Sequence, residues 1–129
     1  MMKNPNWIAI GAASAFLTVA LGAFAAHGLE DRLSPEQHEW WATAVQYQAL
    51  HALGLLAFGI WRHLRPGGGL VGWSFVVGTV LFSGSLYGMA LGGSHGLGMV
   101  TPFGGLAFLV GWGAFAWGSR GKSAEDLTH

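Results

Sequence analysis

Long apolar segments alternate with short polar ones along the chain. Each apolar segment is about 20 residues long, the length of helix that crosses the hydrocarbon core of a bilayer. None contains Asp, Glu, Lys or Arg, and the segments are Trp7–Ala26, Trp41–Trp61, Leu70–Leu91 and Met99–Trp117. This pattern predicts an all-α integral membrane protein, folded as a single domain over residues 1–129. We expect a four-transmembrane-helix bundle with helices at about residues 7–26, 34–63, 70–91 and 99–118.

The second helix is predicted to begin outside the membrane. The run Ser34-Pro35-Glu36-Gln37 has the form of a capping box with proline at the first helical position. The run Pro66-Gly67-Gly68-Gly69 predicts the end of this helix and a tight turn. The helix is therefore expected to run from about Ser34 to about His63, with its first turns in water.

The distribution of Lys and Arg predicts the orientation. With four crossings, the N-terminus, the second loop and the C-terminus lie on one side of the membrane. Arg32 stands alone on the opposite side, whereas the first side holds Lys3, Arg62, Arg65, Arg120 and Lys122. By the positive-inside rule, both termini are predicted to be cytoplasmic, or on the matrix side in a mitochondrion. We expect the first apolar segment to be retained, because it is longer than the core of a usual signal peptide.

Composition narrows the classes of function. The chain is 52% hydrophobic and 9% charged, and six basic residues balance six acidic ones, so its charge gives no reason to expect nucleic acid as a partner. With no cysteine, it forms no disulfide, thiolate metal site or thiol nucleophile. The 22 glycines suit a membrane, where helices associate by close packing along small residues. The glycines expected at helix contacts are Gly11, Gly22, Gly84, Gly88, Gly92, Gly104 and Gly111.

Polar residues within the predicted membrane segments form the candidate site. His51 lies halfway between Trp41 and Trp61, near the bilayer midplane, where an ionisable side chain should face the bundle interior. Three interpretations stay open for it: a hydrogen bond between helices with a partner such as Ser83 or Thr18, a ligand or proton-handling site, and a metal or haem ligand. The candidate site residues are His51, Tyr47, Gln48, Ser83, Ser85, Tyr87, His27 and Thr101.

The depth of these candidates bears on function. Most fall in the outer half of the membrane, whereas residues 53–61 and 106–117 are apolar. A pore needs a polar path throughout, so the sequence favours a shallow polar pocket open to the outer face. It contains no catalytic, metal or cofactor motif, and we do not expect an enzyme.

Two functions are therefore considered. The favoured one is a small structural or accessory subunit that binds partner helices or membrane lipid. The alternative is an oligomeric small-molecule binder or transporter that uses the outer pocket. The many small residues lead us to expect a homo-oligomer or a larger membrane complex, and no nucleic acid partner.

Four motifs follow one another along the chain: GAFAAHGL at residues 22–29, WATAVQYQALH at 41–51, LFSGSLY at 81–87, and TPFGG at 101–105 followed by Gly111-Trp112. Together they resemble the small bacterial inner-membrane family catalogued as domain of unknown function 423, which has a small mitochondrial transmembrane relative. The resemblance covers essentially the whole chain. It implies the four-helix membrane architecture and a multi-pass location in the bacterial inner (plasma) membrane, and it brings no activity with it.

Overall fold

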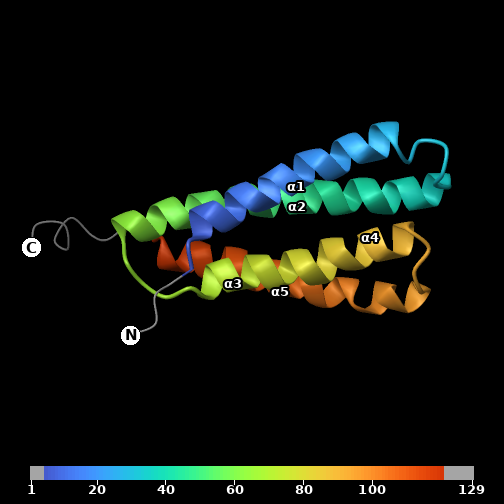
Figure 1. The fold of residues 1–129 in the computed structure, drawn as a ribbon. Coiled ribbons are helices and arrows are strands. Elements are labelled where there is room, and N and C mark those ends of the chain that lie inside the picture. The colour runs from blue at the N-terminus through green and yellow to red at the C-terminus, as the bar shows by residue number, and fades with distance from the viewer. Residues whose placement is uncertain (1–4, 121–129) are drawn as a thin grey trace, which may run out of the picture.

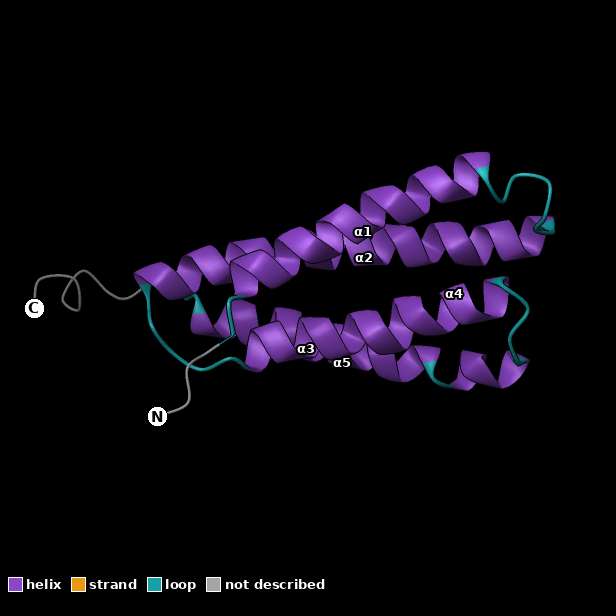
Figure 2. Ribbon diagram, in the orientation of Figure 1, coloured by secondary structure: helices purple, strands orange, loops and turns teal. Residues whose placement is uncertain are grey.

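Two helical hairpins pack against each other in the computed structural model, which describes residues 5–120 (Figures 1 and 2). The first hairpin pairs α1 (Trp7–His27) with α2 (Pro35–Leu64). The second is built from shorter elements: α3 (Leu70–Gly78), the π-helical turn η1 (Thr79–Ser83), α4 (Gly84–Ala90), the 3-10 helix η2 (His95–Met99) and α5 (Thr101–Gly118). Every element of the described part is helical, which confirms the all-α prediction.

The bundle has two chemically different ends. At one end, which we call the acidic end, the loop between α1 and α2 carries Glu30 and Asp31, and the loop after α4 lies at the same end (Figure 1). At the opposite, basic end, Arg62 and Arg65 precede the turn into α3. The start of α1 and the end of α5 also lie at the basic end (Figure 1).

Local capping explains where α1 and α2 begin. The Asn6 side chain accepts a hydrogen bond from the Ala9 amide at the start of α1. At the start of α2, Ser34 Oγ accepts from the Gln37 amide and Gln37 Oε1 accepts from the Ser34 amide, so the predicted capping box is confirmed. Such reciprocal bonds satisfy two amides that no helical carbonyl can reach.

The third predicted segment does not run as one regular α-helix. In η1 the Gly84 amide donates to the Thr79 carbonyl five residues back, which makes a π-helical turn between α3 and α4. This turn lies where α5 approaches most closely, since a Cβ added at Gly104 would overlap the backbone of Phe82. The extra residue per turn rotates everything after it relative to α3.

Within residues 5–120, three helical segments are long and apolar enough to cross a membrane, namely Trp7–His27, Leu70–Ala90 and His95–Gly118. The remaining long helix, α2, falls outside this set because it carries Gln46, Gln48 and His51 among its apolar residues. It is also the helix that packs against most of the others, and it buries the polar side chains of Gln48 and His51.

The glycines differ in what surrounds them. A Cβ at Gly11 would come within 3.0 Å of α2, and one at Gly111 would come within 2.7 Å of the Phe75 ring, so both lie at tight helix contacts, as does Gly104. Gly22 has only ordinary contact with Val45, and Gly88 faces Leu97.

Two of the predicted packing glycines have no such contact. Nothing lies within 4 Å of an added Cβ at Gly84, which is exposed directly after the π-helical turn, or at Gly92, which lies in the loop after α4. Gly92 instead has a φ of 97°, which a side chain would disfavour. Tight contacts that the spacing did not predict occur at Gly54, Gly59, Gly72 and Gly78.

Candidate functional site

His51 is the centre of the candidate site, and its ring is only 1% exposed. Trp112 Nε1 on α5 donates to His51 Nε2 over 2.9 Å. Because Nε2 accepts this bond, the ring proton lies on Nδ1, which donates to the Tyr47 carbonyl over 2.7 Å. The imidazole is therefore neutral, and both of its nitrogens are occupied. Phe108 stacks on the ring with a centroid separation of 3.4 Å, which further fixes its plane.

This geometry confirms that His51 lies in the bundle interior and bonds a side chain of another helix. The suggested partners, Ser83 and Thr18, were wrong. Ser83 Oγ, at the π-helical turn, donates to the Ala44 carbonyl of α2 over 2.8 Å. Thr18 Oγ1 donates to the Ser14 carbonyl of its own helix, as hydroxyls inside membrane helices commonly do.

A second set of hydrogen bonds ties three helices together nearer the acidic end. Tyr87 on α4 donates to Gln48 Oε1 on α2 over 2.7 Å. The Gln48 Nε2 group faces α1, where it donates to Ser14 Oγ at 3.3 Å and lies 3.4 Å from the Ser14 carbonyl. Gln48 thus uses both ends of its amide in contacts between helices, and it is buried.

The remaining candidates occupy separate places. Ser85 Oγ on α4 pairs with Thr101 Oγ1 on α5 and also donates to the Phe82 carbonyl. Tyr47 is 39% exposed, and its ring packs on Phe82 and Phe108. His27 lies exposed at the end of α1, away from the other candidates.

The candidate residues therefore form local pairs rather than the lining of one polar pocket. A cleft of about 550 Å³ between α2 and α5 includes Tyr47 and His51, but its other lining residues are mainly apolar, among them Leu50, Phe108 and Leu109. In the described part of the chain, no group of three His, Cys, Asp or Glu side chains is placed to hold a metal ion.

Sequence reasoning missed two residues of this arrangement, Trp112 and Ser14. A signal for Trp112 existed: unlike the tryptophans near the ends of the predicted segments, it lies inside one, where its N–H needs an acceptor. No comparable signal marks Ser14.

Gln46 is a polar side chain of the predicted membrane segments that faces outward. Gln46 on α2 is exposed and makes no hydrogen bond with any residue between 5 and 120. It lies in a groove of about 470 Å³ between the last part of α1 and the first part of α2, whose other lining residues include Gly22, Ala26, Ala42 and Val45. This groove is the part of the apolar surface that carries an unpaired amide.

Comparison with known proteins identifies relatives along nearly the full chain. The family model described as "Protein of unknown function (DUF423)" matches residues 21–105. The UPF0382 membrane protein YwdK of Bacillus subtilis is 44% identical over 109 residues, which cover 82% of this chain and 89% of that protein. The UPF0382 inner membrane protein YgdD of Escherichia coli is 38% identical over 131 aligned positions, covering 99% of each protein. No solved structure matches. The chain is thus a membrane protein that belongs to the DUF423 family.

Proposed function

We propose that this protein is a structural or accessory component of the bacterial inner membrane, not an enzyme, and that it associates with other membrane helices. The observation that carries this proposal is the internal pairing of its intramembrane polar groups. Gln48 with Tyr87, Ser85 with Thr101 and His51 with Trp112 all bond between helices. Side chains used in this way hold a bundle together, and among the intramembrane residues that the structure describes they are not free to bind a substrate.

The proposal includes four crossings with both termini in the cytoplasm. In this arrangement α2 also crosses the membrane, in addition to the three apolar segments. Its buried polar side chains face the bundle, while exposed residues such as Leu53 and Ile60 face lipid. The basic end, with Arg62 and Arg65, is the cytoplasmic one.

Reporter fusions test this topology. A fusion at Leu127 and one within residues 67–69 should both report cytoplasm, and one near Glu36 should report the outer side. A cytoplasmic signal at Glu36 would show that the assigned orientation, or the number of crossings, is incorrect.

We expect a second helix to pack in the groove beside Gln46, because the Gln46 carboxamide needs a hydrogen-bond partner in lipid. An unpaired carboxamide is costly in hydrocarbon, whereas a carboxamide on a neighbouring helix satisfies it by donating and accepting at once. Two copies of Gln46 are complementary in this sense, and we propose a homo-oligomer with this groove at its interface.

Mass measurement of the purified protein in a mild detergent tests the association. The expected result is a dimer or higher oligomer that Gln46→Leu weakens about threefold in dissociation constant, as one membrane hydrogen bond allows. Leu53→Ala, at an exposed site of α2 outside the groove, is the control. Monomer alone with no co-purifying protein would contradict the proposed association.

The alternative, a small-molecule binder, has one observation in its favour. The cleft between α2 and α5 is about 550 Å³ and places the Tyr47 ring beside His51. Its apolar lining suits a hydrophobic ligand. Density for such a molecule in an experimental structure, or a ligand that co-purifies and is lost in Leu109→Trp, would favour this alternative.

A further inference from the structure

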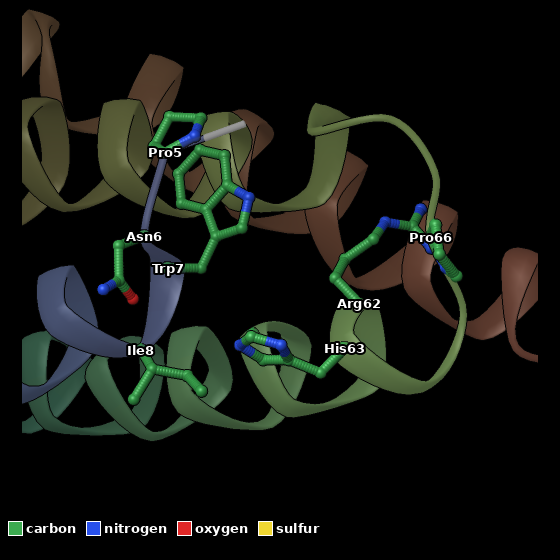
Figure 3. A pocket seen from close by; sticks show the side chains of 8 residues that line it. Pro5, Asn6, Trp7, Ile8, Arg62, His63 and Pro66 are labelled. Carbon is green, nitrogen blue, oxygen red and sulfur yellow. The ribbon is translucent and has the colours of Figure 1, made fainter. Parts of the chain in front are cut away.

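A cleft at the basic end is lined by hydrogen-bond donors, some of which have no acceptor within the described residues. It is about 330 Å³ and lies between the start of α1 and the end of α2, and its lining includes Asn6, Trp7, Arg62, His63 and Pro66 (Figure 3). None of the residues lining it is acidic. In residues 5–120 every Asp and Glu belongs to the acidic end, from Glu30 to Glu39.

Trp7 supplies the first donor. Its side chain is 3% exposed, and its indole nitrogen has no hydrogen-bond partner within the described residues. Figure 3 shows this nitrogen on the edge of the ring that faces Arg62. A buried N–H without an acceptor is uncommon in folded proteins, so it points to an acceptor that residues 5–120 do not provide.

Arg62 supplies the charge. Its Nε donates to the Gly68 carbonyl at 2.8 Å and its Nη1 to the Arg65 carbonyl at 3.1 Å. The guanidinium also lies 4.3 Å from the Trp61 ring centroid, which holds its plane in place. These contacts use two of its five N–H groups, and no acidic side chain of the described chain neutralises it.

We propose that this cleft binds the phosphate group of an anionic phospholipid. The indole N–H and the N–H groups of Arg62 beyond those bonded to Gly68 and Arg65 match the acceptor oxygens of a phosphate diester. Because no acidic side chain of residues 5–120 neutralises Arg62, a lipid without a cation in its headgroup is favoured. Two exposed apolar side chains at the start of α3, Leu70 and Trp73, lie at the same end of the bundle and offer a surface for acyl chains. Basic residues at a cytoplasmic membrane surface favour anionic lipids in the same way.

This inference rests on the proposed membrane placement of the protein, but its test does not depend on orientation. The full-length protein in detergent is exposed to phosphatidylglycerol or phosphatidylcholine of identical acyl chains, and bound lipid is counted by native mass spectrometry. Micelles have no sidedness, so a failed topology experiment and a failed binding experiment are distinguishable.

We expect phosphatidylglycerol to be retained about tenfold over phosphatidylcholine, with Arg62→Gln abolishing the preference. Trp7→Phe, which removes one N–H and breaks no hydrogen bond of the described chain, should reduce phosphatidylglycerol binding about threefold. Arg120→Gln is the matched control, because this arginine lies at the same end outside the cleft, and it should leave binding within about twofold.

Several outcomes would overturn the proposal. Equal retention of the two lipids would do so, as would unchanged phosphatidylglycerol binding in Trp7→Phe. Inorganic phosphate alone is added as a separate arm, and if it binds the lipid-free protein with the same dependence on Arg62, the site is one for a free anion. Arg62→Gln also removes two bonds of the turn, so its melting temperature is measured, and Trp7→Phe decides the outcome if that variant misfolds.

Discussion

The acidic half of the bundle combines small apolar clusters with hydrogen bonds between helices, whereas the basic half is held by aromatic packing. Gln48–Tyr87 and Ser85–Thr101 are bonds of the first kind. In the basic half, a cluster of buried apolar side chains packs together with no hydrogen bond among them: Trp7, Leu55, Phe58, Val71, Phe75 and Phe108. The His51–Trp112 pair lies at the boundary between the two.

The two halves therefore illustrate two sources of stability in lipid, namely close packing of side chains and hydrogen bonds between helices. Hydrocarbon gives no hydrophobic drive for helix association, so close contact of rings and glycines has to supply most of the attraction. Hydrogen bonds between membrane helices contribute about 0.6 kcal/mol each on average. We infer that the basic half supplies most of the stability and that the acidic half fixes which faces of the helices meet.

The largest expected effect is the loss of a central ring. Phe75 is fully buried between Trp112, His51 and Gly54, and Phe75→Ala should lower the free energy of unfolding by about 3 kcal/mol through lost contacts and a cavity. Unfolding in mixed micelles measures it. Phe16→Ala, at a site 74% exposed, serves as the control and should change stability by less than about 0.5 kcal/mol.

A slightly smaller effect is expected from added bulk at the π-helical turn. Gly104→Val should cost about 2 kcal/mol, because its Cβ would overlap the backbone of Phe82, which cannot move as a side chain can. Gly113→Val is a matched control on the same helix, since nothing lies within 4 Å of an added Cβ there. Equal melting temperatures for the two variants would contradict the close contact between Gly104 of α5 and the backbone of Phe82 in η1.

The comparison also shows what the sequence could and could not predict. Apolar runs, the capping box and the depth of His51 are local or one-dimensional properties, and the helices, the start of α2 and the interior position of His51 follow from them. The π-helical turn depends on how closely α5 approaches Phe82, which no local pattern records. Because that turn changes the rotation of α4, spacing alone assigned Gly84 to a helix contact that it does not make.

The candidate site was only partly predictable for the same reason. Residues one turn apart on α2 were recognisable as a group, but their partners come from other helices. Gln48 meets Ser14 across 34 positions and His51 meets Trp112 across 61. Only the packing of the helices decides which side chains meet across such separations.

A moderate effect is expected from the hydrogen bond between α4 and α2. Tyr87→Phe keeps the ring against Trp41 and removes only the hydroxyl that donates to Gln48. The loss should be about 1 kcal/mol, above the membrane average because Gln48 Oε1 is left buried without a donor. A double-mutant cycle with Gln48→Leu isolates the pair, and a coupling energy of zero would remove this bond from the account of the acidic half.

The smallest effect is expected at the boundary between the halves. Trp112→Phe keeps a ring against Phe75 and removes the N–H that donates to His51. The free energy of unfolding should fall by about 0.6 kcal/mol, less than for Tyr87→Phe, because the smaller ring opens His51 Nε2 to the cleft between α2 and α5. His51→Leu should cost a similar amount if the histidine only connects helices. Their coupling in a double-mutant cycle should then account for most of either single loss.

If His51 instead binds a ligand in the cleft between α2 and α5, Trp112→Phe frees Nε2 as an acceptor and ligand binding should become tighter. His51→Leu would then abolish ligand binding while the fold stays intact. Opposite responses of these two variants would therefore overturn the structural role proposed for His51, and parallel small losses of stability would support it.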